Sequence, residues 1–534
     1  MTTTLELFRQ GRMDEIWTRH CGFIDLSVEE FMDIQERLLL EQIGLLGSSE
    51  LGREILGGRV PSTVEEFREL VPLTSYQDYY PYLADRREDV LPRKPLWWLH
   101  TSGRSGPDFK WVPYTEEAAK KLGECGMTTI IFASCTRPGE FLFEEGDTML
   151  YALAPFPYMS GAMARGFARE FSFTFLPPLE DAEAMEFQER IQEGFRLALR
   201  SGLDAFNGVA SVLVKIGEQF TEGAGGLKLS TYLLDPRVLG RMVRGLIRSR
   251  LDGRSYLLPR DLWDVKCLGT GSTDTALFRS QIEEHWGRTP IEAYGATEAT
   301  GILSVQAWNA KGLTFFPDVD FLEFIPEAEH IRNRQDPGYR PELCLLDEVE
   351  AGQRYELVIT NFWGGVFTRY RVGDLIEIVS LGDEEIGTDL PQMTFYSRAD
   401  GIIDLAAFTR LTEKDVWQAI EEAEVAYADW MARKEVASEK PLLHLYIEPT
   451  EPAEAEELRE KIDAGLGEIH KPYAEFKEML GMEPLKVTLL PRGAFARYFF
   501  ERQKEGADLA QLKPPHMNAS DEVMEVFTRY MADV

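Results

Sequence analysis

The sequence predicts an α/β protein with a large N-terminal domain and a smaller α/β C-terminal domain. The chain has 534 residues, which is more than one hydrophobic core ordinarily organises. Short apolar runs alternate with helical patterns from about residue 95 onward, as in parallel strands joined by helices. A mixed helix and strand pattern resumes after residue 400, once a stretch of extended runs has ended.

The first domain is expected at 1–398. Apolar residues recur at spacings of three and four in residues 1–90, for example at Phe31, Ile34 and Leu38, and predict helices. A parallel sheet with helices on both faces is then predicted from apolar runs at 128–134, 148–154, 171–178 and 291–296. No helical pattern is seen at about 310–398, where a β-rich subdomain is predicted from runs at 313–317, 355–362, 374–380 and 393–398.

The second domain is expected at 399–534. Its patterns follow the order helix, strand, helix, strand, which suits a compact α/β domain. The helices are predicted at 413–434 and 453–466, and the strands at 442–449 and 485–491.

Composition excludes some functions. A net charge of −33 argues against nucleic acid and anionic membranes as partners, since both attract positive charge, and its simplest role is solubility. Five cysteines without a CxxC pair indicate a reducing compartment and no disulfide framework. The N-terminal residues lack a signal-peptide pattern, and no apolar run approaches the roughly 20 residues that span a bilayer. We therefore expect a cytoplasmic protein.

The first candidate site is HTSGRSGPDFKWVPYT at residues 100–115. Its small residues leave backbone N–H groups accessible, so that the loop can surround phosphate oxygens. Arg104 and Lys110 add positive charge, and Thr115 suits the N-cap of a following helix. The run lacks the GxxxxGK[ST] pattern and, taken alone, also fits a surface turn. Its small residues are Thr101, Ser102, Gly103, Ser105 and Gly106.

The second candidate is YGATEATG, from Tyr294 through Gly295 to Gly301. A strand that ends here places Thr297 and Glu298 at the carboxyl edge of the sheet, where open α/β folds bind ligands. Thr297 can donate to a phosphate, and Glu298 can hold Mg²⁺. A solvated glutamate after an ordinary turn fits equally well. The nearby GTGSTD at 269–274 lacks the third glycine of a dinucleotide fingerprint and is retained only as a pocket loop.

Two further candidates follow in the chain. In GGVFTRYRVGD, Asp374 follows a Val-Gly turn and precedes a strand, where its carboxylate can accept both ribose hydroxyls. Arg369 and Arg371 alternate along this segment and are expected to share a face, as in any strand with paired charges. Lys513, in GADLAQLKPPHM, is a compact cation suited to a transferring phosphoryl oxygen, although a solvated loop lysine is the simpler interpretation.

The order of these motifs is more specific than any one of them. A Ser/Gly/Thr loop, a YGxTE-type box, an RVGD-type box, an Arg-x-Asp hinge and a C-terminal lysine occur in this order in the adenylate-forming superfamily, which includes acyl-CoA synthetases, peptide-synthetase adenylation domains and firefly luciferase. The chain resembles more closely the plant-type acyl acid amido synthetases, the Gretchen Hagen family. TNFWGGVFTRYRVGD at 360–374 resembles that family's TNFAGLYRYRVGD, and EGADLAQLKPPH at 505–516 resembles QGAS-x-x-QYKTPR.

This resemblance implies an enzyme that uses ATP and Mg²⁺ to adenylate a small carboxylic acid and then transfers the acyl group to an amine or amino acid. It also implies a mobile C-terminal lid that turns about a hinge at Ser397–Asp400. The resemblance implies that Ser102, Gly103 and Ser105 bind the ATP phosphates, with Arg104 beside them, and that Thr297 contacts the α-phosphate. Glu298 would bind Mg²⁺, Asp374 and Arg398 would bind the ribose, and Lys513 would stabilise the adenylation transition state. Further nucleotide contacts are implied for Thr101, Gly106, Tyr294 and Gly295.

Two departures from the family pattern concern the fine geometry. Arg104 replaces the usual threonine of the phosphate loop, and His516 replaces the arginine near the C-terminus. Two alternatives stay open at this point. Coenzyme A could be the acceptor, which would give a thioester, or the protein could sense ATP and a carboxylate without turnover. The joint presence of Glu298, Asp374 and Lys513 argues against a sensor, while the identity of the acid is not indicated.

Overall fold

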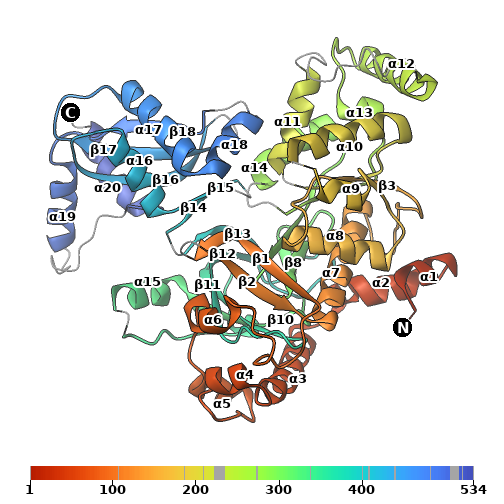
Figure 1. Ribbon diagram of the computed structural model, residues 1–534, viewed down its shortest axis with the longest axis horizontal. Coiled ribbons are helices and arrows are strands. Elements are labelled where there is room, and N and C mark those ends of the chain that lie inside the picture. The colour runs from red at the N-terminus through yellow and green to blue at the C-terminus, as the bar shows by residue number, and fades with distance from the viewer. Residues whose placement is uncertain are drawn as a thin grey trace. The chain divides into compact units, whose positions relative to one another are not determined.

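The structure is a computed structural model in which the chain forms two compact units, each described here by itself (Figure 1). The first comprises Met1–Asn333 with Gly338–Tyr396, and the second Arg334–Pro337 with Ser397–Val534. That the chain has two domains that move separately, with limits at 1–398 and 399–534, stays a prediction. The described residues are 2–105, 108–185, 187–208, 210–221, 235–271, 275–336, 338–399, 401–406, 409–437, 440–480, 483–504, 516–519 and 521–532.

The N-terminal segment is helical, as its periodicity predicts. Its longest helix begins because the Ser27 side chain caps the backbone N–H of Glu30 while the Glu30 carboxylate caps the Ser27 N–H. The apolar side of this helix is buried, including Phe31 and Leu39. The helices are α1 (Thr4–Arg9), α2 (Met13–Cys21), α3 (Val28–Leu46), α4 (Glu50–Ile55), α5 (Val64–Leu70) and α6 (Tyr76–Leu83).

One mixed sheet of 11 strands forms the centre of the first unit, in the order β10-β11-β12-β13-β9-β8-β7-β6-β5-β3-β4. The α/β class is thus confirmed. Strands β3 to β7 pair in parallel. The pairs β7–β8, β8–β9, β9–β13, β10–β11 and β11–β12 are antiparallel. The predicted β-rich region therefore extends the same sheet. The strands are β3 (Thr148–Tyr151), β4 (Thr174–Leu176), β5 (Ala205–Gly208), β6 (Cys267–Thr270), β7 (Ile291–Ala296), β8 (Gly301–Gln306), β9 (Leu313–Phe315), β10 (Asp320–Pro326), β11 (Arg354–Asn361), β12 (Tyr370–Ser380) and β13 (Gln392–Arg398).

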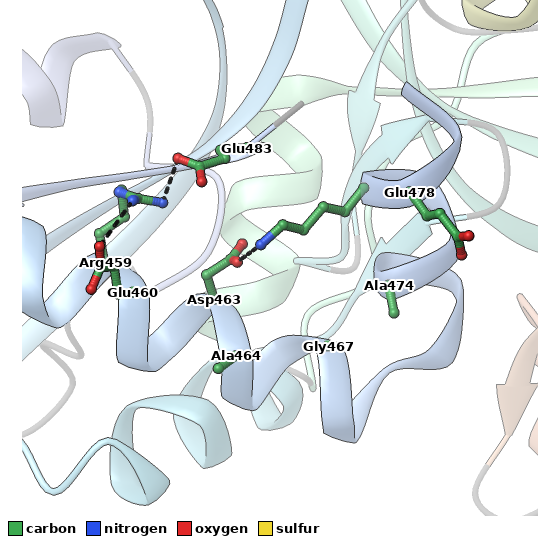
Figure 2. A pocket seen from close by; sticks show the side chains of 9 residues that line it. Arg459, Glu460, Asp463, Ala464, Gly467, Ala474, Glu478 and Glu483 are labelled. Atoms are coloured by element: carbon green, nitrogen blue, oxygen red, sulfur yellow. Dashed lines mark hydrogen bonds and ion pairs between the residues drawn. The ribbon is translucent and has the colours of Figure 1, made fainter. Parts of the chain in front are cut away.

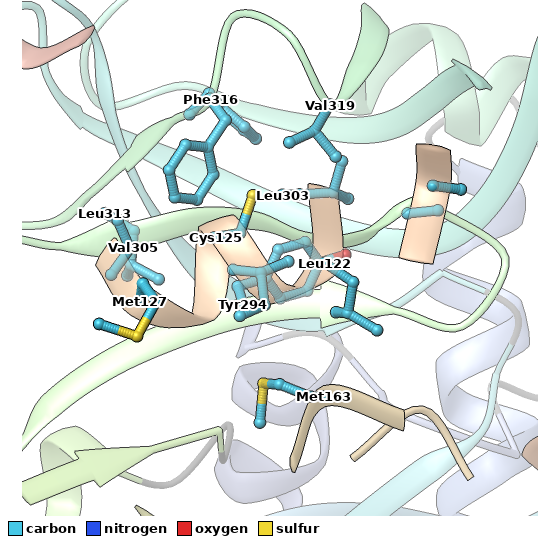
Figure 3. Close-up of a cluster of buried hydrophobic side chains, with 14 of the residues drawn as sticks. Leu122, Cys125, Met127, Met163, Tyr294, Leu303, Val305, Leu313, Phe316 and Val319 are labelled. Atoms are coloured by element: carbon cyan, nitrogen blue, oxygen red, sulfur yellow. The ribbon is translucent and has the colours of Figure 1, made fainter. Parts of the chain in front are cut away.

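Two predictions for this unit were wrong. The run 128–134, predicted as a strand, forms the end of helix α7 (Glu116–Ser134), and helix α15 (Glu327–Gln335) lies where no helix was expected. Thr115 caps α7, and all its residues from 125 to 134 are buried, so its apolar run has no period that separates helix from strand. Helix α7 packs on the sheet and on α8 (Met159–Glu170) through buried apolar side chains. Figure 3 shows these side chains as sticks and labels Leu122, Cys125, Met127, Met163, Tyr294, Leu303, Val305, Leu313, Phe316 and Val319.

The remaining elements of the first unit comprise a separate antiparallel pair and a group of helices. The pair is β1 (Trp97–Ser105) with β2 (Asp108–Tyr114). The helices are α9 (Leu179–Glu183), α10 (Phe187–Ser201), α11 (Ala210–Thr221), α12 (Pro236–Leu251), α13 (Pro259–Leu262) and α14 (Thr275–Trp286). None of the helices in the described part of the chain combines the length and apolar character that a bilayer crossing requires. All five cysteines are free thiols.

The second unit is built on a three-stranded sheet, β16-β17-β18. The helix predicted at 413–434 was wrong in its second half, because the helix ends at Glu422 and a strand follows. Glu424 takes a left-handed conformation (φ 53°), and pairing of Trp430 with Ile447 outweighs the helical pattern. The elements are β14 (Ile403–Ala406), β15 (Thr409–Leu411), α16 (Glu413–Glu422), β16 (Tyr427–Ala437), β17 (Lys440–Pro449), α17 (Ala455–Ile469), α18 (Lys471–Leu480), β18 (Leu485–Leu489), α19 (Ala494–Lys504) and α20 (Asp521–Ala532).

Candidate active site

The YGATEATG motif forms the tight turn between the antiparallel strands β7 and β8. A Cβ added at Gly295 would lie 2.2 Å from the carbonyl oxygen of Gly301, so only glycine allows the two strands this approach. Gly301 itself has φ +112°, a conformation that side chains rarely adopt. These glycines place Thr297 and Glu298 directly after the carboxyl end of β7, as the sequence predicts.

A buried polar network holds this turn in place. Asn361, at the end of β11, donates its Nδ2 to the carbonyl oxygen of Glu298 at 3.0 Å and to Oδ1 of Asp320 at 3.1 Å. Thr300 donates its backbone N–H and its hydroxyl to the two carboxylate oxygens of Asp320, at 3.0 and 2.7 Å. Tyr114, on β2, places its hydroxyl 2.8 Å from the carbonyl oxygen of Ala299. Each end of the turn is therefore bonded to a neighbouring strand.

Asp320 is the buried anchor of this network. Burial raises the pKa of Asp320 to about 6, and hydrogen bonds from Thr300 and Asn361 act in the opposite direction. The side chain therefore loses its proton below neutral pH, despite being completely buried. A carboxylate at this point can accept all three donors at once, which a neutral acid cannot do as well.

The carboxylate of Glu298 contacts side chains from two other motifs of the first unit, HTSGRSGPDFKWVPYT and GGVFTRYRVGD. Its Oε1 lies 3.4 Å from the ammonium of Lys110, on β2, and accepts a 3.3 Å hydrogen bond from the hydroxyl of Tyr370, at the start of β12. Lys110 also lies over the ring of Tyr76, 5.5 Å from its centroid. The fold thus gathers parts of HTSGRSGPDFKWVPYT, YGATEATG and GGVFTRYRVGD around one carboxylate.

Asp374 is joined to the same motif. The hydroxyl of Tyr294, on β7, donates to Oδ2 of Asp374, on β12, at 2.6 Å. Both side chains are buried. The sequence predicts Asp374 as a ribose ligand and Tyr294 as a nucleotide contact, and the structure places them in direct contact.

The two arginines of the RVGD segment have structural partners. Arg369 precedes β12 with φ 45° and forms a bidentate pair with Glu323, at 2.9 and 2.8 Å. Arg371 instead pairs with Glu356, which also contacts His330 at 2.6 Å. The expectation of an extended segment with both arginines on one face was therefore wrong at Arg369, because a left-handed residue interrupts the extended backbone.

Other predicted residues are placed less completely. Thr101 is buried in β1, Ser102, Gly103, Arg104 and Ser105 form the end of that strand, and Arg398 ends β13. Gly106 and Lys513 lie outside the described residues, as do residues 272–274 of the GTGSTD run and Asp400 of the expected hinge. The roles assigned to all these residues stay predictions.

Sequence reasoning missed Tyr114, Asp320, Asn361 and Tyr370 as members of the candidate site. Asn361 and Tyr370 lie within the TNFWGGVFTRYRVGD run, so a reading of every polar residue in that run would have included them. Tyr114 lies within HTSGRSGPDFKWVPYT and could have been included in the same way. No local signal marks Asp320, since its contacts depend on how distant strands pair.

The donor set fits a magnesium ion that is shared with nucleotide phosphates. Mg²⁺ prefers oxygen ligands and is commonly held by one or two carboxylates together with phosphate oxygens. Glu298 offers a partly exposed carboxylate that already faces the Lys110 cation. Within the described ranges, no group of three or more His, Cys, Asp and Glu side chains could form an all-protein metal cage.

A separate cavity of about 690 Å³ lies in the second unit, between α17 and α18 (Figure 2). Its charged side chains are largely paired with one another, since Asp463 contacts Lys477 and Arg459 contacts Glu483 at 2.8 Å. None of the residues predicted for the site lines this cavity. We therefore place the candidate active site at Glu298 and Asp374.

Comparison with protein families gives three consecutive matches. Residues 21–155 match the GH3 family N-terminal domain, residues 313–398 the GH3 family central domain, and residues 412–522 the GH3 family C-terminal domain. Together these matches cover more than half of the chain. They include the motifs that carry Lys110, Asp374 and Lys513, while YGATEATG and GTGSTD lie between the first two matches.

Curated relatives and solved structures are similar over nearly the whole chain. A jasmonoyl–L-amino acid synthetase of Nicotiana attenuata is 23% identical, over 90% of each chain. An indole-3-acetic acid-amido synthetase of Arabidopsis thaliana is 24% identical, over 86% of this chain and 87% of its own. The fold is similar to that of the GH3.15 acyl acid amido synthetase (TM-score 0.53, 16% identity, 99% and 97% covered) and of a 2-hydroxyisobutyryl-CoA ligase (TM-score 0.56, 16% identity, 95% and 93% covered).

Proposed function

This chain belongs to the GH3 family, and we propose that it activates a carboxylic acid with ATP as an acyl-adenylate and then transfers the acyl group to the amine of an amino acid. The protein is an adenylate-forming ligase of the amido synthetase type, the activity named for its full-length relatives. The observation that carries the proposal is the meeting of three motifs at Glu298 and Asp374.

The chemistry has two balanced steps. In the first, a carboxylate oxygen of the acid attacks the α-phosphorus of ATP, the bond to the bridging oxygen breaks, and pyrophosphate leaves. In the second, the amine nitrogen attacks the acyl carbon, AMP leaves with the electron pair of the broken C–O bond, and the nitrogen loses a proton. The protein mainly aligns the reactants and stabilises charge.

The described residues suit particular parts of this work. Asp374, held by Tyr294, is proposed to accept the ribose hydroxyls, and Thr297 to donate to the α-phosphate. Glu298 is proposed to hold Mg²⁺, which when bound would neutralise phosphate charge. Lys110 lies beside Glu298 and supplies a second cation to the phosphates. The network behind Thr300 keeps the turn that carries Thr297 and Glu298 rigid before substrate arrives.

Further assignments rest on the motifs alone. We retain Thr101, Ser102, Gly103, Arg104, Ser105 and Gly106 as the phosphate loop, Arg398 as a ribose contact, and Lys513 as the cation that stabilises the adenylation transition state. The partners proposed are a small carboxylic acid and an amino-acid acceptor. A cytoplasmic location is proposed because all five cysteines are unpaired.

Acid-dependent exchange of labelled pyrophosphate into ATP tests the first step. We expect exchange with at least one acid from a panel of aryl and alkyl acids. Glu298→Gln and Asp374→Asn should each lower the exchange rate by about a hundredfold, because the loss of one transition-state contact ordinarily has an effect of this size. Glu377→Gln, on the same strand as Asp374, is the matched control and should leave the rate unchanged. Binding of ATP without exchange for any acid would support the sensor instead.

A further inference from the structure

Helix α12 presents an apolar stripe to solvent. Five of its aliphatic residues are between 47% and 82% exposed, which is unusual for side chains of this size. Their spacing of four, three, one and four residues places them on one side of the helix. The residues of this stripe are Leu239, Val243, Leu246, Ile247 and Leu251.

The orientation of α12 is fixed by its opposite side. Val238, Gly245 and Ser249 are buried, and a Cβ at Gly245 would lie 2.6 Å from the Leu262 side chain at the end of α13. Arg241 donates to the carbonyl oxygens of Leu199, on α10, and Leu262. Figure 1 shows α12 at the edge of the first unit, beyond α10 and α13. The apolar stripe is therefore held outward and cannot turn to the core.

The charge of α12 is opposite to that of the chain. Its 16 residues contain five arginines and no acid, although the whole chain has 90 acidic residues and a net charge of −33. Arg237 and Arg244 lie along one border of the stripe, and Arg250 lies within it. No hydrogen bond or ion pair joins the side chains of these three to another described residue. Asp235 and Asp252, which flank the helix, are paired with Arg200 and Arg254.

A second copy of the chain fits this surface poorly. Two α12 helices packed through their apolar stripes would bring Arg237, Arg244 and Arg250 against the same residues of the other copy. Neither helix has an acidic residue to neutralise them. A bilayer with anionic lipids satisfies both features, because aliphatic side chains enter the acyl boundary while arginines reach the phosphates above it.

We propose that α12 is a peripheral membrane-docking helix that binds the surface of bilayers containing anionic lipids. The negative charge of the rest of the chain acts against this only where it lies close to the bilayer, because charges more than about 8 Å away are screened at physiological ionic strength. The expectation of no membrane partner rests on the net charge of the whole chain, and that sum does not show whether one helix is locally basic. Docking of this kind is reversible, since one short helix buries little area.

Co-sedimentation of the whole protein with vesicles tests the proposal. We expect binding to vesicles of phosphatidylcholine with about 30% phosphatidylglycerol and weaker binding to phosphatidylcholine alone. About 0.5 M NaCl should weaken binding to the anionic vesicles and leave binding to phosphatidylcholine alone largely unchanged. The double variant Leu246→Glu/Ile247→Glu and the triple variant Arg237→Gln/Arg244→Gln/Arg250→Gln should each lower the bound fraction at least about tenfold. Leu381→Glu, at a leucine that is 50% exposed outside α12, is the matched control.

The variants replace exposed side chains, so their folding is expected to be intact, and the acid-dependent exchange reaction provides a check. Binding that survives both α12 variants would overturn the proposal. Absence of binding to every vesicle would also overturn it. If sedimentation velocity then showed a dimer that Leu246→Glu/Ile247→Glu converts to a monomer, α12 would instead be an interface between copies of the chain.

Discussion

The hydroxyl of Tyr294 donates a 2.6 Å hydrogen bond to Oδ2 of Asp374. The two residues are 80 positions apart in the sequence and lie on different strands of the same sheet, β7 and β12. Both are buried, so the bond is made away from bulk water, where an unsatisfied carboxylate oxygen is costly. This contact orients the carboxylate that we propose for ribose binding.

Replacement of Tyr294 by phenylalanine should weaken ATP binding and lower stability. The buried carboxylate of Asp374 loses a donor, which costs about 1–3 kcal/mol in the free energy of unfolding. The KM for ATP in the exchange reaction should rise, because the carboxylate is no longer held in one orientation. Tyr82→Phe removes a solvent-exposed hydrogen bond from the partly buried Tyr82 to Glu54 and serves as the control. Equal KM values for the two variants would argue against the role of this bond.

The Gly295→Ala variant should lose activity through steric strain in the turn. The new Cβ would lie 2.2 Å from the Gly301 carbonyl oxygen, so that β7 and β8 must separate and displace Glu298. We expect the exchange rate to fall at least about tenfold and stability to fall by about 1–3 kcal/mol. Gly44→Ala, in helix α3 with no atom within 4 Å of the added Cβ, should be neutral or slightly stabilising. An active Gly295→Ala enzyme would show that the turn tolerates the shift.

Breaking the buried pair between Arg369 and Glu323 should strongly lower stability. Arg369→Met leaves the Glu323 carboxylate in the core with only a 3.4 Å contact to Arg68, and should cost about 3–5 kcal/mol in urea unfolding. The double variant Arg369→Met/Glu323→Leu should recover most of that loss, because no fully buried charge then remains unpaired and Arg68 is partly exposed to solvent. A double variant as unstable as the single one would indicate that packing, and not charge, dominates.

His516 should make the second unit pH-dependent. Its ring stacks on Trp430, 4.4 Å between centroids, and its two nitrogens contact Asp429 at 2.8 Å and Glu413 at 2.6 Å. Burial lowers the pKa of His516, but the two carboxylates outweigh burial and the net pKa is raised. Both nitrogens can donate only in the protonated ring, so the arginine of the family pattern is replaced by a cation that titrates.

Because the folded-state pKa of His516 is raised, its contribution to stability is complete below the ordinary value of about 6.5 and is lost as pH rises through the folded-state value. Thermal unfolding of wild type and His516→Gln should therefore differ most near pH 6 and least near pH 9. His516→Arg should keep its stability relative to His516→Gln across that range. A constant difference between wild type and His516→Gln would show that His516 is not charged in the folded protein.

Strand and helix prediction succeeded where apolar runs had clear boundaries. The strands at 291–296 and 355–362 were predicted within one residue at each end, and Pro290 and Gly352 mark where they begin. The run 128–134 failed because it is buried on all sides of a helix, and an entirely buried run has no polar face to show its period. Residues 427–434 failed because pairing with β17 outweighed a helical pattern.

The candidate site was predictable where chemistry lay within short motifs. Tyr294, Glu298 and Asp374 could be named from their boxes, and the fold brings these boxes together. The turn's anchor could not be predicted, because Asp320 reaches Thr300 and Asn361 only through the order of strands in the sheet. Lys513 and Gly106 lie outside the described residues, so their roles depend on measurement.

Product analysis by mass spectrometry tests the central claim most directly. The enzyme is given Mg-ATP, an acid that supports exchange, and equal concentrations of pooled amino acids and coenzyme A, with Lys513→Ala as the inactive control. The account predicts an acyl–amino acid amide together with AMP and pyrophosphate, all absent with Lys513→Ala. A thioester with coenzyme A and no amide would contradict it and identify the protein as an acyl-CoA ligase.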